Sequence, residues 1–327
     1  MKTFIGKSAI VVLVYLASQY LYYQYTNTAI LTTPLMRNVI VDAEEHRKAE
    51  IVSFGSSIEY MSHPKEKDRR TMTQRLKTYL PDRKVIQFSQ AAFTMKVLEP
   101  FIKFYRKYVD SNQFYVIELN MDQFSITDKK RFLDRTPERL SYGENLISAM
   151  YKPLSIFNYD YGVLTEKEYK EHEIYLEGVY LGELDSLFNG QHLKAKEVFR
   201  NRYLIQYMYT LDRNNEKIKS LIRLIKFLQK EKINSLFYIT PYDYKSCEKY
   251  FDTEVCHRVL NGNIKVLTDI LDEYNLNYLN LSKDLSTDYI ATTPMAPNGH
   301  LKGKGRDYNA KMISAWIKEN LGVISPN

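Results

Sequence analysis

Five short apolar runs, separated by amphipathic segments, constrain the fold of this chain most strongly. The runs cover residues 50–55, 84–89, 113–120, 233–240 and 276–282. Each is continuously apolar rather than alternating, which is typical of parallel strands covered by helices on both faces. Apolar residues recur three and four positions apart in segments 96–108, 215–232 and 264–274, which predicts helices. The alternation predicts an α/β domain with a doubly wound, flavodoxin-like parallel sheet of about five strands.

One long region interrupts this alternation. Between residue 125 and about residue 200 the chain is rich in Tyr, Glu and Lys and has no strong strand pattern. We interpret it as an insertion beside the carboxyl edge of the sheet, where open α/β folds bind their ligands. It is either a cap over a substrate or a helical decoration without function.

The N-terminus predicts the compartment. Residues 8–23 are uncharged and mostly apolar, and Lys2 and Lys7 precede them. With the aromatic residues that follow, residues 4–25 are just long enough to cross the hydrocarbon layer of a membrane. The two lysines favour a cytoplasmic N-terminus, so the segment reads as a signal anchor. A cleaved signal peptide and a buried soluble helix are the alternatives, although no clean cleavage pattern follows the apolar run.

This anchor divides the chain into three parts. They are a cytoplasmic N-terminus with the transmembrane anchor (1–25), a polar neck (26–49) and the α/β domain (50–327). We therefore expect a single-pass protein of the cell membrane whose main domain lies outside the cytoplasm, in the periplasm or on the outer surface.

Composition excludes some classes of function. The chain is 44% hydrophobic and 26% charged, so it has ample apolar material for a packed core. Its formal net charge is +7, but basic residues are spread among acidic ones, and we do not expect nucleic acid as a partner. The 28 Tyr suit sugar faces and membrane interfaces as well as an ordinary core.

Only two cysteines are present, Cys247 and Cys256. Outside the cytoplasm such a close pair can form a disulfide, whereas in the cytoplasm both would remain thiols. His257 adjoins the second cysteine, but no further Cys or well-spaced His completes a zinc-binding set. We expect neither a metal nor an organic cofactor.

Two polar residues that follow predicted strands are candidates for chemistry. Ser57 follows Gly55 and Ser56 at the end of the first strand, where a tight turn exposes a side chain above the sheet. His300 lies after the last strand and before a final amphipathic helix. There it can act as general base to a hydroxyl at the end of the first strand, since we expect both residues to follow strands at adjacent or nearly adjacent positions in the sheet. The Gly-Ser-Ser turn alone is weak, because many strands end in this way.

Together these features resemble the SGNH (GDSL-like) hydrolase superfamily, and especially its membrane-tethered bacterial branch that acts on cell-surface polysaccharides. The family block Gly-Asp-Ser matches residues 55–57, which implies Ser57 as nucleophile. The block Asp-x-x-His-Leu matches residues 297–301, which implies His300 as base. The resemblance covers about residues 50–124 and 233–321.

Two further blocks imply an oxyanion hole. The block Asn-x-Gly-x-x-Gly falls on residues 87–92 and implies the backbone N–H of Ala92. The block Gly-x-Asn-Asp falls on residues 120–123. Strict alignment places Asp122 at the position of the family's Asn, but a carboxylate would oppose a developing oxyanion, so we expect Asn120 to serve.

The chain departs from the family at the triad acid. The expected Asp is Pro297, so His300 lacks its usual partner. Asp288 or Asp284 could substitute, or a Ser-His dyad could suffice.

The resemblance implies a serine esterase or O-acyltransferase acting on an acylated envelope or exported polysaccharide. Its partners would be the acylated glycan, the membrane, and a membrane acyltransferase or export complex. One alternative resembles the D-alanyl transfer protein of cell-wall polymers. The other is a non-catalytic glycan-binding or scaffold subunit of a polysaccharide export system.

Overall fold

The computed structural model describes most of the predicted α/β domain. The residues described are 39–60, 66–89, 93–109, 112–124, 207–290 and 300–321, with a few isolated positions. The insertion at about 125–200, Ala92 and Pro297 lie outside them, as does almost all of the anchor at 4–25. Within the described part of the chain, no helix has both the length and the apolar character required to cross a membrane. The anchor and the insertion therefore stay predictions.

Five parallel strands form one sheet in the order β2-β1-β3-β4-β5. They are β1 (Ile51–Gly55), β2 (Val85–Ser89), β3 (Phe114–Leu119), β4 (Ser235–Ile239) and β5 (Asn277–Asn280). Each strand lies within one predicted run. This order is that of flavodoxin-like sheets, so the predicted fold class of the domain is confirmed.

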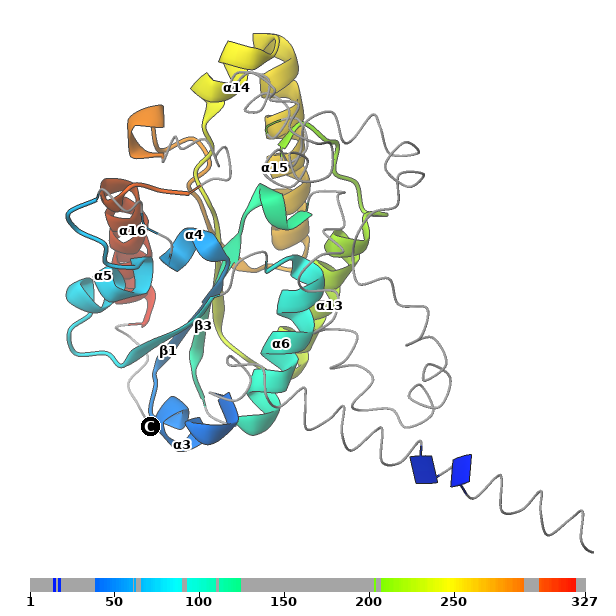
Figure 1. The fold of residues 1–327 in the computed structure, drawn as a ribbon, viewed down its shortest axis with the longest axis vertical. Coiled ribbons are helices and arrows are strands. Elements are labelled where there is room, and N and C mark those ends of the chain that lie inside the picture. The colour runs from blue at the N-terminus through cyan, green and yellow to red at the C-terminus, as the bar shows by residue number, and fades with distance from the viewer. Residues whose placement is uncertain are drawn as a thin grey trace, which may run out of the picture.

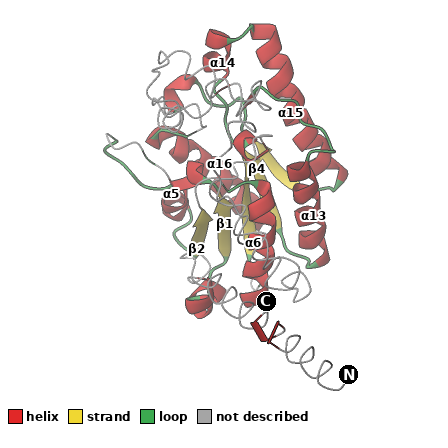
Figure 2. Cartoon of the chain, turned by 45° about the vertical axis from the view of Figure 1, so that its right-hand side comes forward, coloured by secondary structure: helices red, strands yellow, loops and turns green. Residues whose placement is uncertain are grey.

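Helices cover both faces of the sheet, as Figures 1 and 2 show. On one face lie α6 (Met95–Tyr108), α13 (Glu216–Lys230) and α15 (Thr253–Glu273), and on the other lie α5 (Met72–Tyr79) and α16 (Gly303–Leu321). Strand residues alternate between the two cores: Tyr115 and Ile117 face the first, whereas Val116 faces the second. Because both faces are buried, every strand position favours an apolar residue, which explains the continuous apolar runs.

Two helices differ from the sequence prediction. Helix α15 begins at Thr253 rather than at residue 264, because the Asp252 carboxylate caps it by accepting from the Val255 N–H (3.0 Å). Helix α5 was not among the helices predicted from the spacing of apolar residues. It begins with a capping box, in which Thr71 and Gln74 each accept a hydrogen bond from the other's backbone N–H.

Helix α3 (Ala43–Arg47) packs at the amino edge of the sheet. Gln113, just before β3, donates from Nε2 to the carbonyls of His46 (2.6 Å) and Ala49 (2.9 Å). The His46 ring also meets Phe88 edge-on at 5.1 Å. The last part of the predicted neck therefore packs against the domain.

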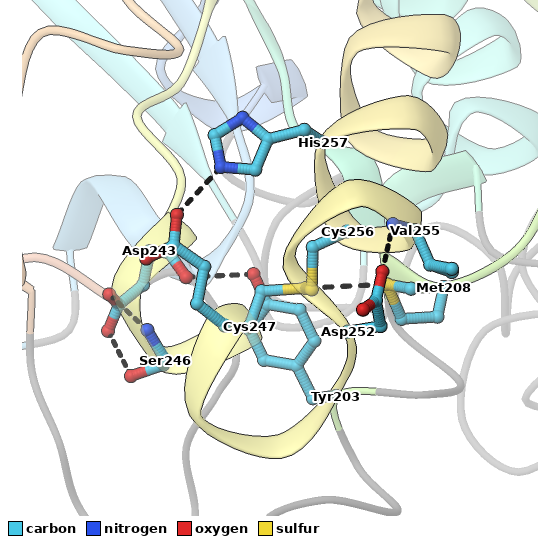
Figure 3. Close-up of a disulfide and its surroundings, with 10 residues drawn as sticks. Tyr203, Met208, Asp243, Ser246, Cys247, Asp252, Val255, Cys256 and His257 are labelled. Atoms are coloured by element: carbon cyan, nitrogen blue, oxygen red, sulfur yellow. Dashed lines mark hydrogen bonds and ion pairs between the residues drawn. A yellow bond between two sulfur atoms is a disulfide. The ribbon is translucent and has the colours of Figure 1, made fainter.

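A disulfide joins Cys247, on α14 (Tyr244–Tyr250), to Cys256 in the first turn of α15 (Figure 3). The predicted pairing is thus present, and both cysteines are buried. The neighbouring His257 lies 2.7 Å from the Glu248 carboxylate. In the described part of the chain, no three His, Cys, Asp or Glu side chains gather where they could hold a metal ion.

Candidate active site

Ser57 stands at the carboxyl end of β1, at the first position of the short helix α4 (Ser57–Tyr60). The turn that carries it requires Gly55. A Cβ there would lie 2.4 Å from Cδ of Glu59 and 2.8 Å from Oε2 of Glu118. The chain can approach these two side chains so closely only with glycine at this position.

His300 lies against Ser57. Its Nε2 is 2.9 Å from the Ser57 Oγ, and both side chains are half-buried. This is a hydrogen-bond distance, so the imidazole can accept the hydroxyl proton. The predicted contact between these two residues is confirmed.

The path by which His300 reaches Ser57 differs from the prediction. We expected the two residues to follow adjacent or nearly adjacent strands, but β3 and β4 separate β1 from β5. His300 nevertheless lies beside Ser57, at the carboxyl end of β1. Leu301 pairs with Ile290 in an antiparallel bridge, and α16 packs beside α5. The histidine is therefore placed by a loop and a helix start rather than by its strand.

Arg306 fixes the position of Leu301, and no pattern in the sequence identified it. The residue is fully buried, and its guanidinium donates to the carbonyls of Leu301 and Arg70 and pairs with the Glu66 carboxylate. Gly305 allows the close packing, because a Cβ there would lie 2.7 Å from the Tyr289 carbonyl oxygen. The residue next to His300 is thus fixed by a buried cation.

Neither candidate acid contacts His300. Asp284 is exposed and accepts a hydrogen bond from the hydroxyl of Tyr308 on α16 (2.9 Å). Asp288 is exposed in the 3₁₀ helix η3 (Thr287–Tyr289). Among the described residues, no hydrogen bond or ion pair links either carboxylate to the imidazole. The structure therefore does not bring the predicted acids to the site.

Asn120 lies next to the serine turn. In the register of β1 with β3, Phe54 pairs with Ile117, and Ser57 and Asn120 each follow that pair by three residues. The Asn120 Oδ1 accepts from the backbone N–H of Asp122 in η1 (Met121–Phe124), at 3.2 Å. The Asn120 amide also carries an NH₂ donor, which an oxyanion hole requires. Ala92, the other predicted donor, lies outside the described residues.

Two glutamates that the sequence interpretation missed pack against Gly55, in the turn that carries Ser57. Glu59 and Glu118 are fully buried, and burial raises the pKa of both carboxyls well above the usual range. The nearby Glu59 charge raises the pKa of Glu118 further. A signal was available, because a glutamate inside the doubly covered run FYVIEL has to be buried.

No protein-family model matches the chain, and no curated protein matches its sequence. Among solved structures, it is similar to a lipase/acylhydrolase from Enterococcus faecalis, at 13% identity and a TM-score of 0.41, over 83% of this chain and 96% of that one. It is similar to a GDSL-like lipase from Bacteroides thetaiotaomicron VPI-5482, at 8% identity and a TM-score of 0.41, over 88% and 98%. A third is a carbohydrate acetylesterase family member from Sinorhizobium meliloti, at 11% identity and a TM-score of 0.37, over 84% and 100%. At such identities and TM-scores, the function has to be argued from this chain's own residues.

Proposed function

We propose that this chain is a serine esterase or acyltransferase that acts on O-acyl groups of an envelope or exported polysaccharide. The observation that carries the proposal is the 2.9 Å contact between Ser57 Oγ and His300 Nε2. The pair lies at the carboxyl edge of a doubly wound sheet, which is where such folds bind their ligands. The sequence blocks that resemble the SGNH superfamily fall on the same two residues.

The proposed reaction has two steps. The Ser57 Oγ attacks the acyl carbonyl while His300 Nε2 takes the hydroxyl proton, and the imidazolium then protonates the leaving sugar oxygen. Water or a second sugar hydroxyl next gives its proton to His300 and attacks the acyl-serine carbonyl. The imidazolium then protonates Ser57 Oγ as the bond between Oγ and the acyl carbon breaks, which releases the free acid or the new sugar ester. The Asn120 amide would stabilise the oxyanion in both steps, together with the backbone N–H of Ala92.

Sequence features support the substrate class and the compartment. The apolar run at residues 8–23 and the preceding lysines favour a domain outside the cytoplasm. The disulfide between Cys247 and Cys256 is typical of oxidising compartments. Abundant tyrosine suits contact with sugar rings. A membrane acyltransferase or an export complex would then be the partner of the domain.

Hydrolysis of p-nitrophenyl acetate and release of acetate from an acetylated polysaccharide test this proposal. We expect Ser57→Ala and His300→Ala each to reduce the rate by on the order of 10³-fold or more. Ser286→Ala, a change at an exposed serine, is the matched control. Full activity of Ser57→Ala would rule the proposal out. Adding an unacylated oligosaccharide separates transfer from hydrolysis.

A non-catalytic glycan-binding subunit is the second candidate. The feature that favours it is Pro297, which stands where the resemblance expects the Asp of the triad. It predicts that the wild-type protein binds the polysaccharide without turnover, and that Ser57→Ala leaves this binding intact.

A further inference from the structure

Two buried carboxyls and a tyrosine form a cluster beneath the serine turn. Glu59 follows Ser57 by two residues on α4, and Glu118 lies on the adjacent strand β3. The hydroxyl of Tyr238, on β4, bridges them at 3.0 Å from Glu59 Oε1 and 3.3 Å from Glu118 Oε2. All three side chains are fully buried.

The described residues supply no cation to this cluster. The side chains that contact the carboxyls are neutral: Ser53 and Gln87 contact Glu59, Ser56 contacts Glu118, and Tyr238 contacts both. The arginines on the covering helices are engaged elsewhere, Arg75 of α5 with Asp68 and Asp307, and Arg306 of α16 with Glu66. His300 contacts the turn through the Ser57 hydroxyl. Two buried carboxylates without a counter-charge are strongly unfavourable, so the pair has to retain one proton.

Hydrogen-bond accounting places that proton on Glu118. Glu59 accepts from the Ser53 hydroxyl (2.7 Å) and the Gln87 amide (3.2 Å), and Tyr238 lies closer to it than to Glu118. A tyrosine hydroxyl has one proton to donate. If Tyr238 donates it to Glu59, its contact with Glu118 is a hydrogen bond only when Glu118 donates.

We propose that Glu59 and Glu118 are positioning residues for the Ser57–His300 pair, with Glu118 held neutral and Glu59 charged. This inference rests on the proposed function. Both side chains pack against Gly55, and Glu118 accepts a hydrogen bond from the Ser56 hydroxyl. The cluster therefore contacts Gly55 and Ser56, the two residues that precede the nucleophile, and fixes their position. Loss of the shared proton would leave two neighbouring carboxylate charges, and their repulsion would displace the turn at residues 55–57.

The proton can be detected without any activity. Difference infrared spectroscopy between neutral and alkaline pH should show the C=O band of a buried protonated carboxyl in the wild-type protein. The band should be lost in Glu118→Gln and kept in Glu99→Gln. Glu99 is the matched control, because it is buried on the opposite face of the sheet and ion-paired with Arg223. Absence of the band, or its survival in Glu118→Gln, would overturn the assignment.

The positioning role is tested by kinetics with p-nitrophenyl acetate. Glu118→Ala should lower kcat by on the order of tenfold with little change in KM, because the turn is displaced while substrate contacts remain. Glu118→Gln should restore most of this loss, since its amide oxygen can accept from Ser56 and its NH₂ can donate to Tyr238. Glu118→Gln should also lack the decline in kcat that the wild type shows as the shared proton leaves at alkaline pH.

The outcomes separate this inference from the proposed function. Activity that survives Ser57→Ala would refute the proposed function, while the infrared band would still test the shared proton. A normal response to Ser57→Ala combined with no rescue by Glu118→Gln would refute the positioning role alone. If the variants fail to fold, absence of the wild-type infrared band still refutes the inference.

Discussion

Ser57 is supported by the sheet, whereas His300 is supported by a loop and a helix start. The buried charge beneath Ser57 belongs to two carboxyls that contact hydroxyl and amide groups. The buried charge beside His300 is the Arg306 guanidinium, which contacts a carboxylate and backbone carbonyls. The serine half of the site, with Ser57 above Glu59 and Glu118, therefore depends on a retained proton. The histidine half, with His300 and Arg306, depends on an ion pair. The two halves should respond differently to pH and to mutation.

Arg306→Met should have the largest effect on stability. It leaves the largely buried Glu66 carboxylate and the Leu301 carbonyl without their donor. We expect the free energy of unfolding to fall by roughly 3 kcal/mol in urea denaturation, with loss of ester hydrolysis as His300 moves. Arg70→Met removes an exposed pair with Asp68 and a contact with the Thr78 hydroxyl (3.4 Å), and it should cost less than about 1 kcal/mol. Equal losses would mean that the buried pair does not support the histidine half.

Gly55→Ala tests the serine half. The new Cβ would overlap the side chain of Glu59, and we expect a loss of about 1–3 kcal/mol in unfolding free energy together with reduced hydrolysis. Gly262→Ala in α15 is the matched control, because nothing lies within 4 Å of the added atom. That change should stabilise the protein by about 0.5–1 kcal/mol. An unaffected Gly55→Ala variant would show that the turn is not tightly packed.

The pH dependence of stability distinguishes the two halves further. Burial raises the pKa of the buried glutamate pair well above the 4.5 of an exposed Glu, and the Glu59 charge raises the pKa of Glu118 further. From pH 4.5 up to the raised pKa, the folded protein binds more protons than the unfolded chain, so stability falls as pH rises. The slope should be up to about 1.4 kcal/mol per pH unit for each retained proton. Urea denaturation at pH 5.5, 6.5 and 7.5 should give a shallower slope for Glu118→Gln, and identical slopes would contradict the shared proton.

Asp284→Asn should have the smallest effect. Its carboxylate binds Tyr308 at the surface, so we expect hydrolysis within about twofold of the wild type and a stability change under about 0.5 kcal/mol. A large loss of activity would mean that Asp284 reaches His300 during the reaction.

The sequence predicted the sheet well because a doubly covered parallel strand imposes a strong local pattern. Each of the five apolar runs contains one strand, and the runs also placed Ser57 and Asn120 at strand ends. His300 was identified by its resemblance to a family block. Its position next to Ser57 depends on tertiary contacts such as the bridge between Ile290 and Leu301, and no local pattern encodes them.

What the sequence concealed is the electrostatic support of the pair. Glu118 was hidden by its apolar neighbours in β3, and Arg306 is surrounded by ordinary helix-start residues. Their burial results from tertiary packing of α5 and α16 over the sheet. Glu118 could have been suspected from its position within a buried strand, whereas Arg306 could not.

The position of α3 has a consequence for how the domain would work when tethered. The chain enters through α3 at the amino edge, and the Ser57–His300 pair lies at the opposite edge. Strand β1 alone spans about 17 Å between these poles, at about 3.3 Å per residue. If residues 4–25 do anchor the chain, the domain would turn its serine outward, away from the lipid. It would then meet polymer that has already left the bilayer surface.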